Sequence, residues 1–196
     1  FVTEYLTGRI AVAHNGNIIN AKEIRQQLKE KGIMFNATSD SEVVSSLLAY
    51  CVTTEKSALG GIIQAAGFLR GAFSLVIASS KHKLVAVRDP NGFRPLCIGQ
   101  NETGFAVASE SCALDTCGFA FLRDVLPGEV VVIENGKITQ QGIRLEQKEA
   151  DRGLCIFEYV YFARPDSIID GLSVYEARYN MGIQLAQEYP VDADVV

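Results

Sequence analysis

The middle of the chain carries several short apolar runs rich in β-branched residues, and these runs constrain the fold more than any other feature. They are separated by segments rich in Asn and Gly at 89–92 and 101–104, which are typical of turns. The runs are almost continuously apolar, whereas a strand with one face in water alternates apolar and polar residues. We therefore expect a sheet buried on both faces, and the Asn135-Gly136 pair after the last run predicts a hairpin. The predicted strands are 72–78, 84–88, 96–98, 105–109 and 130–133.

Three helices are predicted ahead of these strands, at 21–31, 43–50 and 58–69. Asn20 is placed to cap the first helix, and Gly32 is placed to end it. Ser39 and Glu42 have the spacing of a capping box at the start of the second helix. Together with the doubly buried strands, these helices predict layers of α and β structure.

A charge-rich interval at 145–152 interrupts the apolar pattern, and we place a domain boundary there. The predicted domains are 1–150 and 151–196. Beyond the boundary, the apolar and aromatic run 155–163 predicts a strand, and 174–187 predicts a helix. The apolar stripe expected on that helix consists of Ala177, Met181 and Leu185.

Composition narrows the class of protein. The chain has 196 residues, of which 48% are hydrophobic, and a net charge of −5, which disfavours a general nucleic-acid binder or a polybasic membrane surface. It lacks both a signal-peptide pattern and an apolar run of the roughly 18 residues that a membrane span requires. The odd number of cysteines suits reduced thiols in a cytoplasmic protein. The cysteines are Cys51, Cys97, Cys112, Cys117 and Cys155.

A cluster of hydrogen-bond donors follows the first predicted strand, at 9–13. His14, Asn15, Gly16 and Asn17 come directly after it, and Asn and Gly favour a turn here. The turn would present two amide side chains and a flexible backbone N–H at one tip. His14 has two readings at this point, as a base or as a structural residue.

Two other groups also allow two interpretations, and a pair of cysteines is argued against as a metal site. Asp40 lies between two serines and is either part of a helix cap or a ligand-binding carboxylate. Arg88 and Asp89 form either a buried ion pair or a turn. Cys112 and Cys117 lack the C-x-x-C spacing of a zinc site.

The order of the motifs resembles that of the amidophosphoribosyltransferases, a branch of the class II glutamine amidotransferases. The resemblance covers essentially the whole chain. It implies an α+β, N-terminal-nucleophile hydrolase fold, a four-layer αββα sandwich, here truncated at its N-terminus. The motifs are 13–17, 39–42, 88–96, 108–113, 127–129 and 155–167.

The resemblance also implies a reaction and the residues that perform it. Members of this family hydrolyse glutamine with an N-terminal cysteine and transfer the ammonia to phosphoribosylpyrophosphate, which gives 5-phosphoribosylamine in the first committed step of purine synthesis. By motif, Asn15 and Gly16 would form the oxyanion hole, and Asp40 would bind the α-ammonium of glutamine. Preorganised donors of this kind contribute roughly 3–4 kcal/mol each in comparable sites.

The family's cysteine nucleophile has no counterpart here, because the chain starts at Phe1, downstream of that position. We therefore expect a fragment that is inactive alone, and that lacks most of the phosphoribosyltransferase domain after Val196. Two alternatives remain: a non-catalytic module that binds glutamine or a partner domain, and another class II enzyme such as a glucosamine-phosphate or asparagine synthase.

Further expectations follow from the resemblance alone. Cys155 matches the first iron–sulfur ligand of cluster-containing members, although a buried strand cysteine is an equal alternative. Tyr175 lies in the region that links the glutamine and transferase sites. No cofactor is expected within this chain; the full-length enzyme would use Mg²⁺ with phosphoribosylpyrophosphate. A cytoplasmic homo-oligomer without nucleic-acid or membrane partners is expected.

Overall fold

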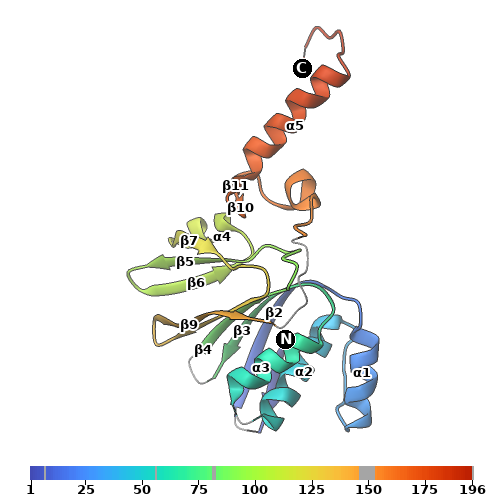
Figure 1. Cartoon of the computed structure of the whole chain (residues 1–196), viewed down its shortest axis with the longest axis vertical. Coiled ribbons are helices and arrows are strands. Elements are labelled where there is room, and N and C mark those ends of the chain that lie inside the picture. The colour runs from blue at the N-terminus through green and yellow to red at the C-terminus, as the bar shows by residue number, and fades with distance from the viewer. Residues whose placement is uncertain (7, 56, 81–82, 146–152, 196) are drawn as a thin grey trace.

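The computed structural model describes residues 1–6, 8–55, 57–80, 83–145 and 153–195. Within these residues the long strands form two antiparallel sheets (Figure 1). The larger sheet has the order β1-β2-β3-β4-β8-β9, and the smaller has the order β6-β5-β7. The strands of the larger sheet are β1 Val2–Tyr5, β2 Gly8–Ile18, β3 Gly71–Ser79, β4 Lys83–Arg88, β8 Glu129–Glu134 and β9 Lys137–Arg144. Those of the smaller are β5 Cys97–Asn101, β6 Gly104–Ala108 and β7 Ala120–Asp124.

Helices cover the outer faces of both sheets. The larger sheet is covered on one face by α1 Ala21–Glu30, α2 Asp40–Thr54 and α3 Ala58–Phe68, and its other face meets the smaller sheet (Figure 1). The short helix α4 Ser111–Thr116 contacts all three strands of the smaller sheet. The order of layers is thus helix, sheet, sheet, helix, and the predicted α+β, αββα architecture is confirmed.

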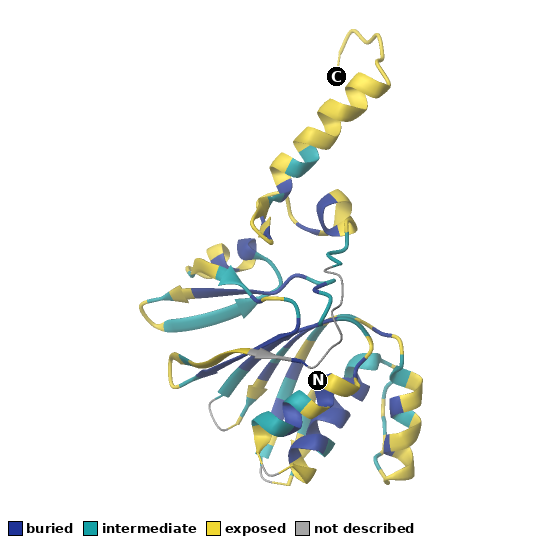
Figure 2. Cartoon of the chain, in the orientation of Figure 1, coloured by how far each residue is buried: buried dark blue, intermediate teal, exposed yellow. Residues whose placement is uncertain are grey.

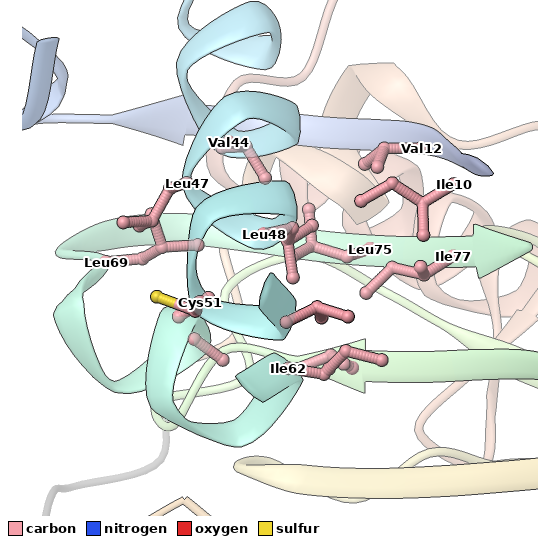
Figure 3. Close-up of a cluster of buried hydrophobic side chains, with 14 of the residues drawn as sticks. Ile10, Val12, Val44, Leu47, Leu48, Cys51, Ile62, Leu69, Leu75 and Ile77 are labelled. Carbon is pink, nitrogen blue, oxygen red and sulfur yellow. The ribbon is translucent and has the colours of Figure 1, made fainter. Parts of the chain in front are cut away.

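The strands of the larger sheet contribute side chains to two cores. In β4, Val85 and Val87 join the core between the sheet and the helices, whereas Ala86 joins the core between the two sheets. The core under the helices is closed by Leu47 and Leu48 of α2 (Figure 3). Successive strand residues point to opposite faces of the sheet. A strand that packs against an apolar layer on each face must therefore be apolar throughout. The runs are therefore continuously apolar because both faces of the sheet are buried, as the sequence predicted.

Two turn signals are confirmed in detail. Asn135 and Gly136 connect β8 to β9 with φ values of 52° and 69°, as the Asn-Gly hairpin signal requires. Gly32 follows α1 with a φ of 85°, and its N–H bonds to the carbonyl of Lys29.

The predicted helix caps form different bonds. Asn20 makes no cap bond; its side chain instead donates to the Phe68 carbonyl and accepts from the Arg70 N–H. Ser39 does cap α2, by accepting from Ser41 N–H. Glu42 binds the N–H groups of residues 36 and 37 rather than that of Ser39, so the capping box is not formed. The loop before α2 takes the carboxylate because its own N–H groups have no ladder partners.

The segment after the sandwich differs from its prediction. Residues 155–163 do not form a strand: a single π-helical turn, η1 Glu158–Phe162, is followed by the hairpin β10 Ile168–Ile169 and β11 Leu172–Ser173. No neighbouring strand pairs with this aromatic run in the described part of the chain. Its side chains instead build a small core of Tyr159, Ala163, Ile169 and Val174.

The last helix, α5 Val174–Glu188, extends away from the sheets and is mostly exposed (Figures 1 and 2). Of its predicted apolar stripe, Ala177 packs against the small core, whereas Met181 and Leu185 are exposed. The predicted domain boundary at 145–152 lies almost entirely outside the described residues. No helix among the described residues combines the length and apolar character needed to cross a membrane.

Candidate active site

The donor cluster lies within strand β2 and not in a turn. Asn15, Gly16 and Asn17 pair in register with residues 74, 73 and 72 of β3, so the predicted turn is wrong. Gly16 has a φ of 145°, and a Cβ at this position would lie 2.0 Å from the Ala72 carbonyl oxygen. The glycine is present because the neighbouring strand approaches too closely for any side chain.

The backbone N–H of Gly16 points away from β3. Its partner in the register is Phe73, whose N–H and C=O both bond to Asp89 on the opposite side. Gly16 and Phe73 therefore form a non-hydrogen-bonded pair of the antiparallel ladder. The Gly16 N–H is consequently directed to the other edge of β2.

Two bonds define that edge of β2. The Val12 N–H donates to the Phe1 carbonyl at 2.8 Å, and the Ile18 N–H donates to Asp40 Oδ2 at 3.0 Å. N–H groups two residues apart on a strand point the same way, so that of Gly16 lies between these two bonds. About 7 Å of strand separates Gly16 from Ile18, a span that one extended amino acid can bridge.

Asp40 is the first residue of α2 and is tied to this edge. Its carboxylate accepts from Ile18 N–H and lies 3.5 Å from the Ser41 hydroxyl, yet its side chain is 26% exposed. The N-terminus of a helix favours negative charge. Since Ser39 makes the cap bond, Asp40 is left with an accessible carboxylate that can bind a cation.

His14 lies beside Asp40 but is buried, with a side chain only 1% exposed. Its Nδ1 is 3.1 Å from the Ser41 hydroxyl, and among the described residues its Nε2 has no hydrogen-bond partner. Burial lowers the pKa of His14, and the Asp40 charge only partly opposes this. An imidazole enclosed in this way has no access to a substrate, which fits the structural interpretation of His14 and not that of a base.

Asn15 faces the opposite side of β2 from His14, toward the second sheet. Its Nδ2 donates to the Ser109 hydroxyl at 3.3 Å. It also lines an open cavity of about 330 Å³. The other residues lining that cavity are Arg94, Glu110, Glu158 and Phe162.

These cavity residues were not assigned a role from the sequence. Arg94 Nη1 pairs with Glu158 Oε1 at 2.6 Å, and its guanidinium lies 5.1 Å from the centre of the Phe162 ring. Glu158 is a lone acid within an apolar run, and its side chain is only 5% exposed. A charged residue in such a run is the one signal that could have identified it, because buried charges need a partner.

Arg88 and Asp89 are both buried, but they do not pair with one another. Arg88 pairs with Asp170 at 2.8 Å, whereas Asp89 accepts from the N–H groups of Asn91 and Gly92 and forms a turn. The turn interpretation is thus confirmed for Asp89, whereas the predicted ion pair is wrong, because Arg88 pairs with Asp170 instead.

Two buried thiols of the sandwich, Cys51 and Cys97, are poorly suited to nucleophilic chemistry. Burial raises the pKa of Cys51 to about 11 and that of Cys97 to about 12. Cys112 is also buried, and Cys117 is exposed at the end of α4. A thiol with a raised pKa is protonated at neutral pH and reacts slowly.

Neither Cys155 nor Tyr175 lines the cavity at Asn15. Cys155 is half-buried before η1, and its N–H bonds to the Phe93 carbonyl at 3.3 Å. Tyr175 is exposed near the start of α5 and stacks on Tyr179. The part of the chain that the structure describes contains no group of three or more His, Cys, Asp or Glu residues placed to hold a metal ion.

The layer order, together with donors at the edge of a sandwich strand, defines an N-terminal-nucleophile hydrolase fold. Residues 2–116 match the family model described as a glutamine amidotransferase domain. The chain belongs to this family of glutamine amidotransferase domains.

Two curated relatives of the chain and one solved structure similar to it are named as amidophosphoribosyltransferases or under the synonym of that name. The chain is 43% identical over its full length to an amidophosphoribosyltransferase of Archaeoglobus fulgidus, of which it covers 42%, and 46% identical to the chloroplastic amidophosphoribosyltransferase 1 of Arabidopsis thaliana, of which it covers 34%. The solved structure of glutamine phosphoribosylpyrophosphate amidotransferase from B. subtilis, complexed with ADP and GMP, matches 99% of the chain with a TM-score of 0.90 and 38% identity, and 42% of that structure is covered. The chain thus spans about two fifths of the length of these relatives.

Proposed function

We propose that this chain is the glutamine-hydrolysing part of an amidophosphoribosyltransferase. The observation that carries the proposal is the edge of β2, where the Gly16 N–H and the Asp40 carboxylate lie within reach of one extended amino acid. The family match and the full-length similarity to amidophosphoribosyltransferases support the same assignment.

The proposed chemistry follows from the charges of the groups. A cysteine thiolate attacks the side-chain amide carbon of glutamine, and the carbonyl oxygen becomes negative. The Asn15 amide and the Gly16 N–H donate to that oxygen. The α-amine of the cysteine, which took the thiol proton, gives it to the amide nitrogen, so the C–N bond breaks, ammonia leaves and a thioester remains. Asp40 binds the α-ammonium, so the site reads a free amino acid. Water then releases glutamate.

The remaining assignments rest on the resemblance and the relatives. We propose that residues 1–150 are the glutaminase domain and that residues 151–196 are the connection into, and the first elements of, a phosphoribosyltransferase domain. There ammonia would react with phosphoribosylpyrophosphate in the presence of Mg²⁺, in a cytoplasmic homo-oligomer. The exposure of α5 is compatible with a further domain packing against it. Tyr175 on that helix would contact the transferase side.

Cys155 remains a proposed iron–sulfur ligand. Its half-buried position at the edge of the sandwich is compatible with binding a cluster. The other thiolates would have to come from elsewhere in the protein, because a cluster of this kind is held by four ligands. Metal analysis of the full-length protein and of its Cys155→Ser variant tests this.

Asn15→Ala and Asp40→Ala separate the two proposed roles. In the full-length protein with an intact N-terminal cysteine, Asn15→Ala should lower kcat for glutamine hydrolysis about 10²–10³-fold with little change in KM, because the oxyanion forms only in the transition state. Asp40→Ala should mainly raise KM. Steady-state glutaminase kinetics measures both.

Exposed residues of the same types provide the controls, Asn36→Ala and Asp115→Ala, which should leave both constants unchanged. If Asn15→Ala mainly raised KM and Asp40→Ala mainly lowered kcat, the two residues would have each other's proposed role. Absence of glutamine hydrolysis by the wild-type protein, or transfer of ammonia to a hexose phosphate or to aspartate, would refute the proposed function. Binding of glutamine without hydrolysis, seen by calorimetry, would instead identify a non-catalytic module.

A further inference from the structure

Three consecutive residues at the junction of β6 and α4, the last of them the first residue of α4, connect the Asn15 side chain to the segment that follows η1. Ser109 Oγ accepts from Asn15 Nδ2 at 3.3 Å. Glu110 Oε2 accepts from the Arg164 N–H at 2.8 Å and from the Ser167 hydroxyl at 2.7 Å. The next residue, Ser111, accepts from the Ile168 N–H at 2.8 Å. One tripeptide thus bonds to two regions that lie far apart in the sequence.

The tripeptide is itself held in place. It follows directly on β6, whose last residue, Ala108, pairs with Cys97 of β5. At its other end the Glu110 carbonyl accepts from the Ala113 N–H in the first turn of α4. Ser111 and its neighbour Ser167 are 3% and 1% exposed. The Ser109 hydroxyl therefore projects from a backbone that is fixed on both sides.

The Asn15 carboxamide depends on this hydroxyl for its orientation. Asn15 is exposed on its strand, and within the described residues the bond to Ser109 is the one hydrogen bond of its side chain. The amide nitrogen has two hydrogens. If one is given to Ser109, the second stays available, in a defined direction, for an oxyanion.

From this geometry we infer that Ser109 is a positioning residue for the Asn15 carboxamide, and that Glu110 and Ser111 hold Ser109 in place through the 164–168 segment. The inference rests on the proposed function, because it gives Ser109 a role in that reaction. An oxyanion donor is effective only when it is oriented before the charge forms. Without Ser109, the amide would have to give up side-chain rotational freedom in the transition state.

The test uses Ser109→Ala in the full-length protein with its N-terminal cysteine. We expect kcat for glutamine hydrolysis to fall about tenfold, with KM changed by less than about twofold, since only the transition state uses the oriented amide. Ser109→Thr keeps the hydroxyl and should restore most of kcat. Ser57→Ala, which removes a comparable side-chain bond to a backbone N–H at the start of α3, is the matched control and should leave both constants unchanged.

A double-mutant cycle with Asn15→Ala separates positioning from direct catalysis. If Ser109 acts through Asn15, adding Ser109→Ala to Asn15→Ala should lower kcat no further. If the two effects multiply, Ser109 contacts the reacting atoms itself, and the positioning role is refuted. An unchanged kcat in Ser109→Ala also refutes it. Glu110→Ala should reproduce part of the Ser109→Ala effect, and only where Ser109 is present.

A readout that does not depend on activity keeps this inference separate from the proposed function. In protein labelled with ¹⁵N at asparagine, Ser109→Ala should shift the side-chain amide signals of Asn15 and speed their exchange with water, whereas Ser57→Ala should not. Unaltered Asn15 signals would overturn the inference even in an active enzyme. If Ser109→Ala shifts the Asn15 signals but the wild-type protein hydrolyses no glutamine, the proposed function is refuted and the Ser109 contact is still established.

Discussion

Gly16 shows how a single residue can meet a structural and a chemical requirement together. The carbonyl of Ala72 lies where a Cβ would stand, and the φ of 145° is one that other residues rarely adopt. The same backbone directs the Gly16 N–H to the edge that Asp40 closes. The close approach of β3 and the direction of the donor therefore both depend on the absence of a side chain.

Gly16→Ala should be strongly destabilising. The added methyl group overlaps a backbone carbonyl that cannot move without shifting β3, so we expect a loss of about 3 kcal/mol or more in the free energy of unfolding. Urea denaturation measures it. Gly67→Ala is the control, because its Cβ would meet open space within α3, and a gain of roughly 0.5–1 kcal/mol is expected there. Equal effects at both positions would contradict the steric argument.

His14 makes stability depend on pH. Its pKa is lowered in the folded protein by burial, so between that value and the ordinary value of about 6.5 the unfolded chain binds a proton that the folded chain does not. Stability is therefore full above about pH 7 and falls as the pH drops through 6.5. His14→Asn should remove this fall, measured as the free energy of unfolding from pH 5 to 8. A slope that persists in the variant would assign it to other groups.

At the scale of the element, three residues at the start of α2 make different contacts. Ser39 caps the helix, Asp40 bonds to strand β2, and Glu42 binds the preceding loop. The helix is otherwise held by apolar residues such as Val44 and Leu48. The cap therefore also determines where the Asp40 carboxylate lies.

Ser39→Ala should cost about 1 kcal/mol of stability, the usual loss for a helix cap. It should also raise KM for glutamine, because the first turn of α2 carries Asp40. Ser57→Ala removes the equivalent cap of α3 and should lower the free energy of unfolding by a similar amount, without changing KM. If both variants changed KM alike, the effect would be one of general stability.

At the scale of the whole molecule, an ion pair joins the sandwich to the segment that leads into α5. Arg88 has no exposed surface, and Asp170 of the β10–β11 connection binds it at 2.8 and 3.0 Å. Asp124 lies beside them, and burial together with the Asp170 charge raises its pKa to about 6. The attachment of residues 153–173 thus depends on an ion pair between a fully buried guanidinium and a carboxylate whose side chain is 34% exposed.

Asp170→Asn should destabilise the protein by about 3 kcal/mol, because it removes the carboxylate that pairs with the buried Arg88 guanidinium. Asp166→Asn breaks the exposed pair with Arg164 and should change the stability little, because solvent screens that pair. Thermal unfolding of the two variants gives the comparison. Similar losses would show that the Arg88 pair is no stronger than a surface pair.

The sequence by itself determined the doubly buried sheet, the three helices ahead of it, α5 and the Asn135-Gly136 hairpin, because burial on both faces and left-handed backbone angles leave local traces in residue type. Helix α4 and strands β1 and β7 were not predicted. The sequence also indicated Asn15, Gly16 and Asp40 as a set. Only the tertiary structure decided that 15–17 is strand rather than turn, since Gly16 is required by a contact with Ala72 of a different strand. The tertiary structure also decided that the aromatic run at 155–163 contains a π-helical turn and not a strand, since no strand pairs with it in the described residues. The bond from Asn15 to Ser109 joins residues 94 positions apart, and no local pattern encodes such a pairing.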